Sequence, residues 1–185
     1  MHGRPLRPNL RGLTLWIEGE PEHPPLVLDW REAEQVRYLM WILDMTFKSF
    51  RLPEFPPISD YCPEGRTGDF FTALLVAWCR SSHSGRAADV DPDLLGAARA
   101  YAEETDDALR WAPEPELGIP EFKLTPGAGW LIRPEEIRAA LDKERSSPKP
   151  LTDVLDQPGG LPRKQWFEFV DYLGFGATLF GVRVC

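Results

Sequence analysis

The chain has 185 residues and a formal net charge of −8, with 43% hydrophobic residues, which is ordinary for a globular protein. A chain of this length can bury about 70% of its unfolded surface in one domain without staples. Its negative charge disfavours nucleic acids and membrane surfaces, both anionic, but permits a basic protein partner.

The cysteine count and the hydropathy pattern bear on the compartment. Three widely spaced cysteines do not predict a disulfide framework. No apolar run approaches the roughly 20 residues that a membrane span needs. We therefore expect a cytoplasmic protein, and the 19 prolines with arginine in excess over lysine are typical of a GC-rich bacterial genome.

The N-terminal quarter predicts a tail and a hairpin. Residues 1–10 are rich in arginine and proline and predict a flexible N-terminal tail. The β-prone run Leu13–Ile17 and the run Leu26–Leu28 predict two strands. Residues 19–25 between them contain three prolines and a glycine, which is typical of a turn or short loop.

The next segment predicts one long helix over residues 30–50. Asp29 lies at the N-cap position and Glu32 follows three residues later, which is the spacing of a capping box. Apolar residues then recur at intervals of three and four, so they share one face: Ala33, Val36, Met40, Leu43, Phe47 and Phe50. Trp30 and Trp41 add bulk, and we expect this helix to be the centre of the core.

Two further helices are predicted in the middle of the chain. Residues 53–68 are rich in proline and glycine and predict a long loop. Asp69 then caps a helix over residues 70–80 that is apolar nearly all round and is expected to be buried. The sequence Asp91-Pro92-Asp93 predicts a helix start, and that helix continues to about Trp111. One face of it is expected to contact the core: Leu94 (or Leu95), Ala98, Tyr101 (or Ala102), Thr105 and Leu109.

The last third predicts short strands and two more helices. In chain order the expected elements are strands at 122–124 and 130–132, helices at 134–144 and 163–173, and a strand at 177–184. Gly174 is expected to end the last helix. The sequence therefore predicts an α+β fold for a single domain at residues 11–185, with about five helices around a long central helix. Both chain ends are expected to join a small antiparallel sheet.

Candidate catalytic residues are few. Cys62 and Arg66 lie in the loop at residues 60–69, and His83 follows the second helix. This loop lacks the spacing of a phosphatase loop and the lysine of a Walker A loop, so a solvent-exposed loop is the simpler interpretation. A small hydrolase or transferase with a site near this loop and His83 is one functional hypothesis. No metal site and no cofactor are expected, since Cys62, Cys79 and His83 offer at most three soft ligands at irregular spacing.

The acidic stretch between residues 103 and 121 supports a second hypothesis. Seven acids lie there: Glu103, Glu104, Asp106, Asp107, Glu114, Glu116 and Glu121. Arg110 is the one basic residue among them. Such a stretch is most often a solvated helix face, but it also complements a basic protein surface. The hypothesis is a protein that acts by binding another protein, as an accessory, inhibitor or immunity-type factor. Asp106 and Asp107 are expected to lie off the apolar stripe of their helix. A structural subunit is a third possibility, and the oligomeric state is left open.

Aromatic residues near the C-terminus predict a further surface. One face of the last predicted helix is expected in the core: Trp166, Phe169, Val170 and Leu173. The aromatic residues that do not fit this face are candidates for an exposed patch: Phe167, Tyr172, Phe175 and Phe180.

Overall fold

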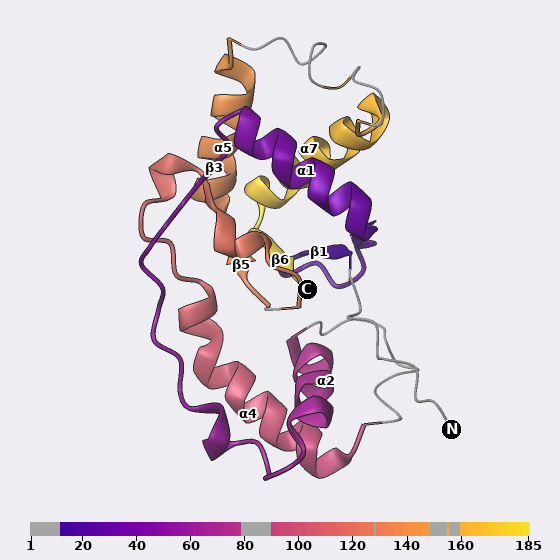
Figure 1. Cartoon of the computed structure of the whole chain (residues 1–185), viewed down its shortest axis with the longest axis vertical. Coiled ribbons are helices and arrows are strands. Elements are labelled where there is room, and N and C mark those ends of the chain that lie inside the picture. The colour runs from indigo at the N-terminus through magenta and orange to yellow at the C-terminus, as the bar shows by residue number, and fades with distance from the viewer. Residues whose placement is uncertain (1–11, 79–89, 128, 149–154, 156–159) are drawn as a thin grey trace, which may run out of the picture.

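The structure is a computed structural model that describes residues 12–78, 90–127, 129–148, 155 and 160–185. The described part has the predicted α+β architecture, with five α-helices and a small antiparallel sheet (Figure 1). The helices are α1 Trp30–Ile42, α2 Thr67–Trp78, α4 Pro92–Leu109, α5 Pro134–Ser146 and α7 Arg163–Thr178. Among the described residues, no helix combines the length and the apolar character needed to cross a membrane.

The main sheet joins the two ends of the chain. Its strands are β1 Leu13–Ile17, β2 Leu26–Leu28, β5 Leu131–Ile132 and β6 Val182–Val184. They lie in the order β2-β1-β6-β5 with antiparallel pairing throughout. The predicted hairpin is confirmed, and the sheet uses both chain ends as expected.

Two shorter strands and three 3-10 turns complete the fold. The strands β3 Thr46–Phe47 and β4 Ile119–Pro120 form a parallel pair apart from the main sheet. The turns are η1 Ile58–Asp60, η2 Pro115–Leu117 and η3 Glu121–Leu124. Residues 122–124 were expected to form a strand, but they form part of η3, which points the side chain of Lys123 into the interior.

The hydrophobic interior consists of two clusters. The larger one lies between the main sheet and helices α1, α5 and α7. The smaller one lies between α2 and α4, which pack side by side at the other end of the molecule (Figure 1). Helix α4 contributes to both clusters, with Leu94, Ala98 and Tyr101 in the smaller and Leu109 in the larger. The prediction that residues 11–185 form one domain stays a prediction.

Helix α1 is shorter than the predicted range of residues 30–50. The capping box of Asp29 and Glu32 starts it as expected. It stops at Ile42 because Asp44 adopts a left-handed conformation with φ 56°. The amides of Asp44 and Met45 then turn back to the carbonyls of Trp41 and Met40, as in a Schellman motif.

The chain beyond α1 is extended, so the predicted inner face is only partly correct. Leu43 is buried, but Phe50 is 85% exposed. Trp30 and Trp41 were expected to add bulk to the core, and both are instead exposed. The apolar residues at 47 and 50 fit a helical spacing by coincidence, because no helix is present there.

Helix α7 continues past Gly174, where it was expected to end. Gly176 packs so closely on the main sheet that an added Cβ would lie 2.4 Å from a methyl group of Val182. Gly176 therefore permits a close approach between α7 and β6. Neither Gly174 nor Gly176 ends the helix. The helix ends at Thr178, and the C-terminal strand is correspondingly shorter than residues 177–184.

Helix α2 is also less buried than expected. Phe70, Ala73 and Leu74 pack against α4, but Phe71 is 48% exposed. The helix begins at Thr67, two residues before the expected cap. The face predicted for α4 is confirmed with Leu94 and Tyr101, rather than Leu95 and Ala102, as its buried members.

Candidate binding surface

The C-terminal half of α4 holds four of the predicted acids. Thr105 marks the inward side of this half, because it is buried; its hydroxyl donates a 2.7 Å hydrogen bond to the Tyr101 carbonyl of the same helix. Glu103, Glu104 and Asp107 therefore lie on the solvent side of the helix, and all three are exposed.

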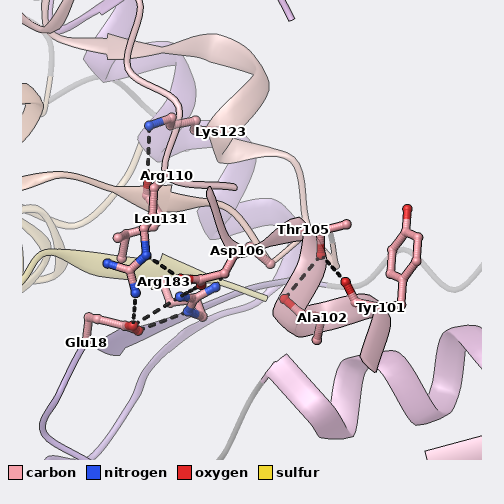
Figure 2. A network of polar contacts seen from close by, with 10 residues as sticks. Glu18, Tyr101, Ala102, Thr105, Asp106, Arg110, Lys123, Leu131 and Arg183 are labelled. Atoms are coloured by element: carbon pink, nitrogen blue, oxygen red, sulfur yellow. Dashed lines mark hydrogen bonds and ion pairs between the residues drawn. The ribbon is translucent and has the colours of Figure 1, made fainter. Parts of the chain in front are cut away.

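Asp106 points toward the main sheet and takes part in an ion-pair network (Figure 2). Its carboxylate accepts from Arg183 at 3.0 Å and from Arg110 at 2.5 Å. Glu18, just after β1, accepts from the same two arginines at 2.9 to 3.0 Å. Arg183 also donates to the carbonyl of Gly129 at 3.0 Å, so its guanidinium is held from three directions.

The network keeps its members charged. Burial alone would raise the pKa of Glu18, but the hydrogen bond and charge of Arg183 lower it below the ordinary value. Burial would likewise raise the pKa of Asp106, and Arg110 and Arg183 lower it. The network joins α4 to β6 and to the end of β1, so Asp106 has a structural role that its expected position off the apolar stripe did not indicate.

Glu104 is also engaged within the chain. Its carboxylate accepts a hydrogen bond from the hydroxyl of Tyr61, which raises the pKa of that tyrosine. The ring of Tyr61 packs edge-on against Tyr101 in the smaller hydrophobic cluster. Glu104 therefore ties the segment after η1 to α4.

Five acids of the stretch make no salt bridge and no side-chain hydrogen bond with any residue in the described part of the chain. We call them the free acids: Glu103, Asp107, Glu114, Glu116 and Glu121. Arg110, the one basic residue among them in sequence, is turned inward to Glu18 and Asp106. Two large apolar side chains in the same stretch are exposed, Trp111 at 42% and Leu117 at 39%.

One cation from a neighbouring helix reaches this region. The ammonium group of Lys143 on α5 donates to the carbonyl of Leu117 at 2.8 Å. It contacts a backbone oxygen rather than a carboxylate, so the negative charge of the free acids stays uncompensated by direct pairs. The free acids with Trp111 and Leu117 form the acidic surface discussed below.

The candidate catalytic residues of the loop at 60–69 make structural contacts. The guanidinium of Arg66 pairs with Asp91, the N-cap of α4, at 2.7 Å and with Asp69 at 3.1 Å. These bonds to Asp91 and Asp69 raise the pKa of Arg66 and hold the loop against α2 and α4. Cys62 is a half-buried free thiol that packs against the smaller cluster. His83 and Cys79 lie outside the described residues.

A buried ion pair was not predicted from the sequence. Lys123 and Glu136 are both 0% exposed, and the Lys123 ammonium lies 2.8 Å from the Glu136 carboxylate. The lysine also donates to the carbonyl of Leu131, and the second Glu136 oxygen has no partner. Burial lowers the pKa of Lys123 and raises that of Glu136. The only sequence signal was a lysine inside the apolar run Phe122-Lys123-Leu124.

Metal ligands do not converge in the described part of the chain, where no group of three or more His, Cys, Asp or Glu side chains could hold an ion. Most of the C-terminal residues lie as expected: Trp166, Phe169 and Leu173 are buried and Val170 is half-buried, while Phe167, Phe175 and Phe180 are exposed. Tyr172, a candidate for the exposed patch, is instead half-buried, and its hydroxyl donates to the Leu15 carbonyl at 2.8 Å.

Comparison with known proteins gives no assignment: no family model, no curated protein and no solved structure matches the chain.

Proposed function

We propose that the protein acts by binding a basic protein through the acidic surface. The observation that supports this proposal most directly is the division of the acids into two groups. Asp106 and Glu104 are used inside the chain, whereas the five free acids have no pairing partner among the described residues. The acids of this stretch that stabilise the fold are paired within the chain, so the carboxylates of the free acids are available to a partner.

The apolar residues of the surface fit the same role. Trp is among the residues that contribute most to protein–protein binding, especially when surrounded by polar groups that exclude water. Trp111 immediately follows the inward-turned Arg110 and keeps 42% of its surface exposed. An exposed aromatic side chain in the same stretch as the free acids offers an anchor to a basic partner, and the acids offer steering.

The hydrolase or transferase hypothesis has less support. The guanidinium of Arg66 is occupied by Asp69 and Asp91, which leaves it poorly placed to hold an anionic substrate. The cytoplasmic location and the bacterial origin stay predictions from composition.

The proposal can be tested with two charge variants. Glu103→Lys with Asp107→Lys reverses two free acids on α4, and Glu20→Lys with Glu22→Lys makes the same change in net charge on the exposed β1–β2 turn. Each protein is immobilised, and binding partners from a bacterial lysate are quantified by mass spectrometry. We expect a stoichiometric basic partner on the wild type and on the turn variant, and its loss on the α4 variant. Equal recovery of every protein on both variants would contradict the proposal.

A further inference from the structure

The outward face of α1 carries three large aromatic side chains. Trp30 is 46% exposed, Tyr38 54% and Trp41 60%, although the helix has only 13 residues. They lie opposite the buried face, which is formed by Ala33, Val36, Leu39 and Met40. The helix crosses the front of the molecule in Figure 1, with its length open to the viewer. Exposed aromatic residues in such number mark an interaction surface.

Two of the charged residues between the two tryptophans lie on the same side of the helix as these rings. Glu34 and Arg37 contact each other at 3.4 Å, and the Glu34 side chain is 69% exposed. The four residues Trp30, Glu34, Arg37 and Trp41 follow one another at intervals of four, three and four. At these intervals they form one stripe along the helix. The stripe is also symmetrical about its midpoint, with an apolar ring at each end and opposite charges on the two sides of the centre.

We propose that this stripe is the interface of a symmetric dimer in which α1 packs antiparallel against α1 of a second copy. A two-fold axis at the midpoint of the stripe places each Trp30 against the partner's Trp41. The same axis places each Glu34 against the partner's Arg37, which makes two intermolecular ion pairs. An interface of this kind is isologous, since the same residues of both copies form it.

The charge order selects this arrangement. In a parallel pairing Glu34 would face the partner's Glu34 and Arg37 the partner's Arg37, and like charges placed together weaken association. The antiparallel register is therefore the one in which every charge of the stripe meets its opposite. It also places a Trp30 beside the partner's Trp41 at each end of the stripe. Within one helix the two tryptophans are roughly 16 Å apart, at a rise of 1.5 Å per residue.

The size of the stripe implies a weak dimer. An aromatic side chain buries about 150–250 Å² when fully covered, and the four tryptophans of the interface are already about half covered by their own chains. The area gained falls below the roughly 1,200 Å² of a standard stable interface, so the dimer should dissociate on dilution. Sedimentation velocity from micromolar to millimolar protein suits such an equilibrium.

The test uses two single charge reversals and their mixture. Glu34→Arg leaves two arginines facing two arginines across the axis, and Arg37→Glu leaves glutamates facing glutamates. We expect the dissociation constant of each variant alone to rise at least tenfold over the wild type. An equimolar mixture should form a heterodimer, because each arginine of one chain then meets a glutamate of the other. A fluorescent label on the Glu34→Arg protein makes the heterodimer visible.

A matched control lies on α5. Asp142 and Arg145 form an exposed pair at the same i, i+3 spacing and the same 3.4 Å distance. Asp142→Arg and Arg145→Glu should leave dimerisation unchanged. A wild type that stays monomeric at millimolar concentration overturns the proposal. So does a mixture of the two α1 variants that remains monomeric, or dimerisation of the single variants at wild-type strength.

Discussion

The substitution Lys123→Met separates the buried ion pair without emptying its site. Lysine and methionine have unbranched side chains of similar length, so the packing is largely kept. In the variant, one oxygen of Glu136 still accepts from the Arg133 amide at 2.7 Å, but the other has no partner. A carboxylate that is 0% exposed would then lack its counter-charge.

The cost of this substitution should be large. Removing one partner of a buried pair typically destabilises by about 3–5 kcal/mol, because the remaining charge stays desolvated. Global stabilities are only about 5–15 kcal/mol, so the variant should lose a large share of its stability at neutral pH. Lys123→Met combined with Glu136→Leu should recover most of the loss, since no buried charge then remains.

The loss should also depend on pH. Burial raises the pKa of Glu136 even beside Lys123, and without the lysine the pKa should rise further. The folded variant then keeps a proton that the unfolded chain releases above the ordinary glutamate pKa of about 4.3. A folded state that binds more protons loses stability as the pH rises, so the defect should be largest at neutral pH and shrink toward pH ~4.

Urea unfolding followed by tryptophan fluorescence measures both effects. The control is Lys164→Met, because the Lys164 side chain is 86% exposed and its pair with Glu168 lies on the surface. The control should change stability by no more than about 0.5 kcal/mol. A similarly small effect for Lys123→Met at pH 7 would refute the assignment of this pair as a buried, coupled element.

Three further substitutions test the packing of individual residues. Leu43→Ala should lower the free energy of unfolding by about 2–5 kcal/mol, because Leu43 is 1% exposed in the larger cluster. Phe50→Ala should change it by no more than about 0.5 kcal/mol, because Phe50 is 85% exposed. Equal losses in thermal unfolding would contradict the end of α1 at Ile42. Gly96→Ala should stabilise by roughly 0.5–1 kcal/mol, since Gly96 lies inside α4 and an added Cβ meets nothing within 4 Å. A lower melting temperature for Gly96→Ala would show that this face of α4 is covered.

Local signals were enough to predict the elements whose determinants lie close in sequence. Helix α4 follows from the Asp91 cap, the proline after it and one apolar stripe, and all three are present in the structure. The end of α1 was missed because Asp44, rather than glycine or asparagine, adopts the left-handed conformation. Capping signals read from sequence rely on the residues that most often take that conformation.

The polar interior could not be predicted, because its members are distant in sequence. Arg183 pairs with Glu18, 165 residues away, and with Asp106, 77 residues away. Spacing within one helix gives no information on such pairs. The composition of the acidic stretch was visible from the sequence, but the division into structural acids and free acids required the position of β6 beside α4.

The association rate with the isolated partner, measured by stopped flow at low and high salt, tests the central claim most directly. Long-range attraction between opposite charges speeds association and is screened within about 10 Å at 0.1 M salt. The wild type and the Glu20→Lys, Glu22→Lys variant should associate quickly at low salt and slow steeply as salt is added. The Glu103→Lys, Asp107→Lys variant should associate slowly with a flat salt dependence. Identical rates and salt slopes for the two variants would show that the acidic surface is a solvated helix face without a role in binding.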